Sequence, residues 1–183
     1  VKTVDVREFI STIRRQPAPA PVILFCPGKA PRARDATFEP FLAERAIDGL
    51  VAANVDPSLR DLAYSVFYAD EAKTGDIVLD ARTVPFLAER RVVLVRGAER
   101  YNSDPPKRAN SERDKSEAST SVLLNYLNSP SDQTLLILVA SQIDKRLKFY
   151  KACEKTGLVV ECPLLSPGEA IQWAIAEAKK KDK

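Results

Sequence analysis

The sequence predicts an α/β fold, a three-layer αβα sandwich built on a parallel sheet. Short and almost wholly apolar segments recur at residues 22–26, 92–95 and 135–139, each the length of a buried strand. Segments with apolar residues at helical spacing separate them. Strands that are apolar on both faces and joined by helices are typical of a parallel sheet covered by helices on both sides.

The first half of the chain alternates helix and strand. Residues 5–14 have helical spacing, and three prolines then force an extended connector into the strand at 22–26. Residues 38–51 predict an amphipathic helix. Residues 63–69 alternate as a strand does, and residues 75–82 predict a short helix.

The second half repeats this pattern after the strand at 92–95. Residues 102–121 are rich in Ser, Pro, Lys, Glu and Asp and nearly free of apolar side chains, which predicts a flexible polar insert at the surface. A helix then leads into the strand at 135–139. Residues 144–156 predict a helix ended by glycine, and residues 158–161 a last strand.

The sequence pattern changes after residue 165. Ser166, Pro167 and Glu169 form a capping-box pattern with proline at the first helical position, so a new helix is expected to begin there. We therefore predict one domain over residues 1–165. Residues 166–183 are expected to be the first helix of a truncated second domain.

Composition excludes several classes of protein. No stretch of 18 or more apolar residues is present, so we expect no membrane segment and a cytoplasmic location. The net charge of +3 is weaker than the basic stripe of a direct nucleic-acid binder. Without histidine, and with three cysteines that lack CxxC spacing, a zinc site or disulfide framework has little support. We expect Cys26, Cys153 and Cys162 to be small core residues and the protein to need no cofactor.

The glycine after the first apolar strand invites a test for a phosphate-binding loop. A Walker A loop needs GxxxxGK[ST], in which backbone amides hold phosphates and a hydroxyl holds magnesium. Gly28 and Lys29 are followed by Ala30, which has no hydroxyl, and Ile23 stands where the first glycine belongs. The strand at 92–95 is followed by no acid before Glu99. These departures argue against ATP hydrolysis.

Five segments in order resemble one known family. They are PVILFCPGKA, FEPFLAERAIDGL, YSVFYAD, ARTVPFLAERRVVLVRGAERYN and LLNYLNSPSDQTLLILVASQIDKRLKFYKACEKTGLVVECPLL. Together they are similar to the N-terminal domain of the delta subunit of bacterial DNA polymerase III clamp loaders, from about residue 21 to residue 165. The polar insert at 102–121 is longer than that family's pattern.

The resemblance implies an AAA+-like fold that has lost its ATP machinery, followed by a helical lid domain. It also implies a non-catalytic subunit that binds the beta sliding clamp and opens it for loading onto primed DNA. Other loader subunits, gamma/tau and delta prime, would be partners through regions missing here. DNA would be met indirectly, within the assembled complex.

The family's clamp-binding residues are a hydrophobic pair at the end of a helix, which matches Phe86 and Leu87. Pro85 and Val84 are weaker neighbours in the same element. An exposed aromatic and a leucine can fill an apolar pocket on a partner. The alternative is that Val84, Phe86 and Leu87 are core residues leading into the next strand.

Basic residues could add a DNA-facing surface in the complex, although a solvated face is the alternative interpretation. They are Arg32, Arg34, Lys145, Arg146 and Lys148. Two rival functions stay open at this point. One is a nucleotide-binding α/β protein that uses Gly28 and Lys29 in an unfamiliar way, and the other is a different, delta prime-like loader subunit.

Overall fold

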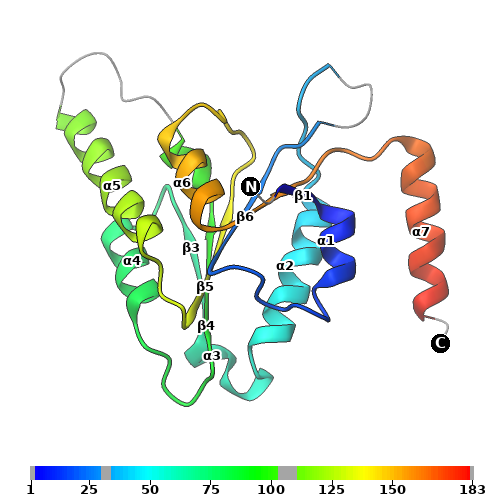
Figure 1. The fold of residues 1–183 in the computed structure, drawn as a ribbon, viewed down its shortest axis with the longest axis horizontal. Coiled ribbons are helices and arrows are strands. Elements are labelled where there is room, and N and C mark those ends of the chain that lie inside the picture. The colour runs from blue at the N-terminus through cyan, green and yellow to red at the C-terminus, as the bar shows by residue number, and fades with distance from the viewer. Residues whose placement is uncertain (1–2, 30–33, 103–110, 182–183) are drawn as a thin grey trace.

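A computed structural model describes residues 3–29, 34–102 and 111–181 (Figure 1). Its centre is a six-stranded sheet in the order β1-β6-β2-β5-β4-β3, in which every pairing is parallel. The strands are β1 (Thr3–Asp5), β2 (Val22–Cys26), β3 (Tyr64–Tyr68), β4 (Arg91–Arg96), β5 (Thr134–Val139) and β6 (Leu158–Glu161). The helices are α1 (Val6–Thr12), α2 (Pro40–Asn54), α3 (Arg60–Ala63), α4 (Thr74–Arg82), α5 (Ser111–Asn128), α6 (Lys148–Thr156) and α7 (Pro167–Lys181), with 3-10 turns η1 (Pro57–Leu59) and η2 (Ala98–Tyr101).

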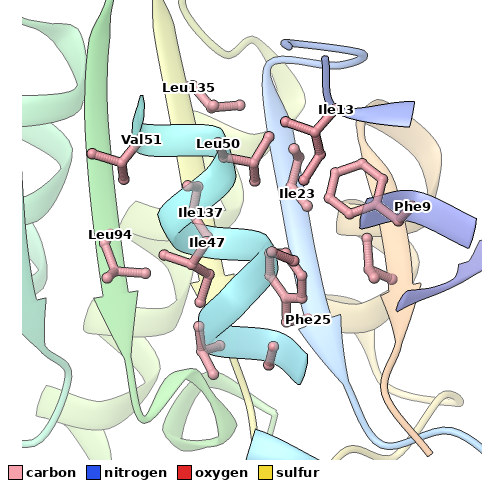
Figure 2. Packing of buried hydrophobic residues seen from close by; sticks show 14 of the residues in the cluster. Phe9, Ile13, Ile23, Phe25, Ile47, Leu50, Val51, Leu94, Leu135 and Ile137 are labelled. Atoms are coloured by element: carbon pink, nitrogen blue, oxygen red, sulfur yellow. The ribbon is translucent and has the colours of Figure 1, made fainter. Parts of the chain in front are cut away.

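Helices cover both faces of the sheet, which confirms the predicted three-layer sandwich. Successive side chains of a strand point to opposite faces. In β2, Ile23 and Phe25 therefore join the cluster under α1 and α2, whereas Leu24 and Cys26 join the cluster under α4, α5 and α6. Figure 2 shows the first cluster, in which Ile47 and Leu50 of α2 lie over the sheet.

The ends of two predicted elements follow from local chemistry. Asp5 caps α1, because its carboxylate accepts the backbone N–H of Arg7 at 2.8 Å. Gly157 ends α6, as expected. A Cβ at that position would lie 2.4 Å from the carbonyl oxygen of Val22, so only glycine allows the chain to pass this close to β2.

The prediction was wrong at residues 102–121 and at residues 144–147, and it missed one strand. The predicted polar insert at 102–121 is in part a helix, since α5 begins at Ser111; residues 103–110 lie outside the described residues. Glu, Arg, Lys and Ala are good helix formers even where no apolar stripe is present. The missed strand is β1, a three-residue edge strand whose alternation is too short to recognise.

The predicted helix at 144–156 begins four residues later, at Lys148. Asp144 accepts the backbone N–H of Arg146 at 2.9 Å and forms a local turn instead. Side chains of this type compete with the helix for backbone donors. The segment 144–147 is therefore a turn that holds Lys145 and Arg146 outside the helix.

The three cysteines are buried and unpaired, which confirms their prediction as core residues. Burial raises the pKa of Cys26 to about 12. Within the part of the chain that the structure describes, no helix is both long and apolar enough to span a membrane.

The capping box at the start of α7 is confirmed. The backbone N–H of Ser166 donates to Glu169 at 2.9 Å, and the Glu169 N–H donates to the Ser166 hydroxyl at 3.4 Å. Arg7 also donates to Glu169, at 2.8 Å. Trp173 packs edge-on against Phe41 of α2 at 5.4 Å between ring centroids, so α7 contacts the sandwich at two points.

The contact between α7 and the sandwich is expected to weaken in acid. Bonds from Ser166 and then Arg7 lower the pKa of Glu169 from 4.5 to about 2. A carboxylate whose pKa is lower in the folded state stabilises it fully above pH 4.5, and the contribution disappears as pH falls towards 2. Fluorescence of Trp173, the single tryptophan, should follow this loss.

A Glu169→Gln variant provides the control for this titration. It keeps the size of the side chain and removes the charge that Arg7 contacts. Its tryptophan signal should be flat between pH 5 and the onset of acid unfolding, which far-ultraviolet circular dichroism reports separately. An unaltered protein with an equally flat signal would contradict the assignment.

Candidate functional site

The connection between α4 and β4 carries three exposed apolar side chains. Val84, Phe86 and Leu87 are 67%, 81% and 69% exposed, and Pro85 between them is half-buried. The alternative that these residues belong to the core is therefore wrong. The connection lies at the bottom of Figure 1, beside α3. We call residues 84–87 the apolar projection.

The end of α4 explains why this segment leaves the helix. The inward face of α4 is buried through Ile77 and Ala81. The helix ends at Arg82, and Pro85 disfavours helical backbone at the residue before it. Phe86 and Leu87 thus lie beyond the helix, in the connection to β4, rather than at the helix end itself.

Leu87 has a left-handed backbone conformation, with φ of 69°. Among the described residues it is the one non-glycine residue with positive φ. A residue with a Cβ pays about 1–2 kcal/mol for this conformation. Strained backbone of this kind clusters at functional sites, which makes Leu87 a candidate site residue.

Arg91 links the elements on either side of the projection through an ion pair and hydrogen bonds. Its guanidinium forms an ion pair with Asp80 of α4 and donates to the carbonyl oxygen of Leu62 in α3 at 2.9 Å. It also donates to the hydroxyl of Ser65 in β3 at 3.3 Å. The mostly buried guanidinium of Arg91 therefore connects α3, β3, β4 and the last turn of α4. These contacts hold together the elements from which the projection extends, and we call them its rigid base.

Further exposed apolar residues and a groove surround the projection. Leu62 of α3 and Leu79 of α4 are more than half exposed. A groove of about 400 Å³ lies between the end of α2, η1 and residues 87–89. No sequence pattern indicates these residues, because they are single apolar positions in separate elements. The site is thus an apolar surface with a depression beside it.

The glycine once considered for phosphate binding serves the fold. The Gly28 N–H donates to the carbonyl oxygen of Thr37 at 2.9 Å, and a Cβ on Gly28 would lie 2.8 Å from side-chain atoms of Glu161 and Pro163. Glu99, the acid that follows β4, accepts hydrogen bonds from Ser141 at the end of β5. The Gly28 amide and the Glu99 carboxylate are thus engaged within the protein, whereas Lys29 is exposed.

A larger groove of about 830 Å³ lies at the carboxyl ends of β3 and β4, the edge where α/β proteins place ligands. Its two arginines are engaged within the protein. Arg96 forms an ion pair with Glu44, and Arg100 donates to the carbonyl oxygen of Ala69. Within the described residues no group of three His, Cys, Asp or Glu side chains could hold a metal ion.

The predicted basic residues come from two separate segments, and two of them form ion pairs. Arg32 lies outside the described residues, and Arg34 is exposed after that gap. Lys145 forms an ion pair with Glu161, and Arg146 with Asp144. Lys148 is exposed at the start of α6. A DNA-facing role for these residues stays a prediction.

Taken together, the parallel sheet, the engaged glycine loop and the apolar projection define an α/β sandwich with an exposed apolar surface. The family model for the DNA polymerase III delta subunit matches residues 38–163. The chain therefore belongs to the DNA polymerase III delta subunit family.

Two known proteins illustrate this relationship. The DNA polymerase III subunit delta of Bacillus subtilis is 29% identical over 147 residues, which cover 79% of this chain and 41% of that protein. The solved structure of the Bacillus subtilis DNA clamp loader delta protein has the same fold, with a TM-score of 0.74 at 24% identity. That match covers 97% of this chain and 48% of the other. The chain thus spans less than half the length of these relatives.

Proposed function

We propose that this chain is the clamp-binding part of a non-catalytic clamp-loader subunit, and that it binds the sliding clamp through the apolar projection. The observation that carries the proposal is the exposure of Phe86 and Leu87, at 81% and 69%, on a rigid base. Exposed aromatic and aliphatic side chains that fill a partner's pocket commonly supply most of the binding energy of an interface.

The contribution to loading is mechanical. A subunit that binds the opened clamp more tightly than the closed ring shifts the equilibrium towards the open form by the difference in binding free energy. The other loader subunits, including gamma/tau and delta prime, would control when the projection is accessible. DNA would then enter a clamp that this chain helps to keep open.

Two of the groups that would serve a nucleotide-binding function are engaged elsewhere. The Gly28 amide and the Glu99 carboxylate already have partners within the fold. The family match to delta also favours this subunit over a delta prime-like one. Residues 1–165 would form the clamp-binding domain, and α7 would begin the lid domain.

Binding to two forms of the clamp tests the proposal. The full 183-residue chain is captured on a surface, and the cognate clamp is applied either as isolated subunits or as a ring whose subunit interfaces are covalently crosslinked. We expect binding to both and tighter binding to the isolated subunits, because no ring-opening cost is incurred. Equal affinity for the two forms would contradict the role in clamp opening. Absence of binding to either form would contradict clamp binding itself.

A further inference from the structure

The groove beside the apolar projection has a mixed lining, with more polar than apolar surface, and two of its lining residues are acidic. Ala53, Val55, Leu87 and Ala88 contribute apolar surface, and its volume of about 400 Å³ is near the lower end of the range of small-molecule sites, about 300–1,000 Å³. This space fits a side chain or two rather than a helix or a strand. Because Leu87 belongs both to the projection and to the groove lining, a partner that binds the projection can place a side chain in the groove.

Two carboxylates line the groove, and no lysine or arginine is among its lining residues. Asp56 caps η1 by accepting the Ser58 N–H at 2.8 Å, and these bonds lower its pKa, which keeps it ionised. Glu89 has no hydrogen-bond or ion-pair partner among the described residues. Its charge is available to a ligand.

The end of α2 adds to this negative potential. The carboxyl end of a helix carries a partial negative charge, which basic residues in the last turn often offset. The last turn of α2 has no basic residue, and Ala52 and Ala53 expose its end to the groove. Asn54 satisfies one carbonyl there, that of Leu50, at 2.8 Å. Arg60, the nearest cation along η1 and α3, is stacked on Tyr64 at 4.8 Å.

We infer that the groove receives a lysine or arginine side chain of the sliding clamp, next to the apolar contact made by Phe86 and Leu87. This inference rests on the proposed function. The long hydrocarbon stem of such a side chain can lie against Ala53, Leu87 and Ala88 while its charged end meets the carboxylates. Charge complementarity of this kind fixes the orientation of two partners and raises the rate of their association.

Charge and shape of the groove are altered separately to test this. Glu89→Lys reverses the free carboxylate, and Ala53→Trp fills the groove from an exposed position of α2. Glu71→Lys is the matched control: it changes net charge equally but follows β3, whereas Glu89 precedes β4. Because β3 and β4 are parallel, these positions lie at opposite ends of the sheet.

Affinity for the cognate clamp is measured for each full-length variant at low and high salt. We expect Glu89→Lys and Ala53→Trp each to weaken binding roughly tenfold at low salt, and Glu71→Lys to change it less than about twofold. The effect of Glu89→Lys should shrink at high salt because ions screen exposed charges, and that of Ala53→Trp should not. A purely structural role for Glu89 would show no such salt dependence.

Three outcomes overturn the inference. If clamp binding needs Phe86 and Leu87 but ignores both groove variants, the proposed function stands and the groove is unoccupied. If the unaltered chain does not bind the clamp, the proposed function and the inference about the groove are both wrong. If the chain self-associates in sedimentation experiments and the groove variants abolish that association, the groove belongs to a second copy.

Discussion

Replacing Phe86 and Leu87 together by alanine is expected to weaken clamp binding at least about 30-fold, which corresponds to about 2 kcal/mol. Both side chains are largely exposed, so the fold does not depend on them. The free energy of unfolding should change by less than about 0.5 kcal/mol. Surface-captured binding and urea unfolding of the same variant measure the two quantities.

Leu87→Gly sharpens this test because it affects stability and binding in opposite directions. Glycine adopts positive φ without the steric cost that leucine incurs at 69°, so unfolding should become harder by up to about 1 kcal/mol. Clamp affinity should nevertheless fall, since the side chain is gone. A loss of binding in a more stable protein cannot be attributed to misfolding.

A matched control comes from the other side of the molecule. Ile171 and Ile175 of α7 are also large exposed hydrophobic residues, one helical turn apart. Their replacement by alanine removes a similar apolar area and should leave clamp affinity unchanged. Equal losses from both double variants would show that binding follows general surface hydrophobicity rather than the projection.

Arg91→Leu is expected to destabilise the protein by about 2–3 kcal/mol. The side chains of Arg91 and Asp80 are only 15% and 18% exposed, and removal of one member of a mostly buried ion pair leaves an uncompensated charge. The carbonyl oxygen of Leu62 and the hydroxyl of Ser65 lose a donor as well. Clamp affinity should fall in the variant that remains folded, because the base of the projection loosens.

The double variant Asp80→Leu, Arg91→Leu shows whether the ion pair is responsible. It removes both charges, so it should recover much of the stability lost by the single variant. Arg146→Leu breaks a pair in which the arginine is 88% exposed, and should cost less than about 0.5 kcal/mol. Each effect is measured as a shift of the urea midpoint, provided that the dependence of the unfolding free energy on urea concentration is unchanged. An Arg91→Leu protein as stable as the unaltered one would contradict this role.

The sheet could be predicted from sequence because burial on both faces leaves a plain signal. Segments such as Val92–Val95 and Leu135–Val139 are apolar throughout, and each lies in a strand whose interior is buried. Strands and helices without that signal were missed or misplaced. Edge strand β1 has three residues, and the first turns of α5 rest on helix propensity rather than an apolar stripe.

The candidate site was predicted only in part, for a physical reason. Hydrophobicity alone does not decide whether Phe86 and Leu87 are buried in this protein, buried in a partner or left exposed. The family resemblance indicated a partner, and the structure shows that they are exposed. Arg91, Glu89 and the groove depend on contacts among α2, α3, α4 and β4, which no local pattern contains.

Hydrogen exchange of the chain, with and without saturating clamp, locates the clamp-binding surface without any substitution. We expect slower exchange in residues 79–91, with a second protected stretch at residues 52–59 along the groove, and no change at the carboxyl ends of β3 and β4. Protection at those carboxyl ends, with residues 79–91 unaffected, would contradict clamp binding through the apolar projection.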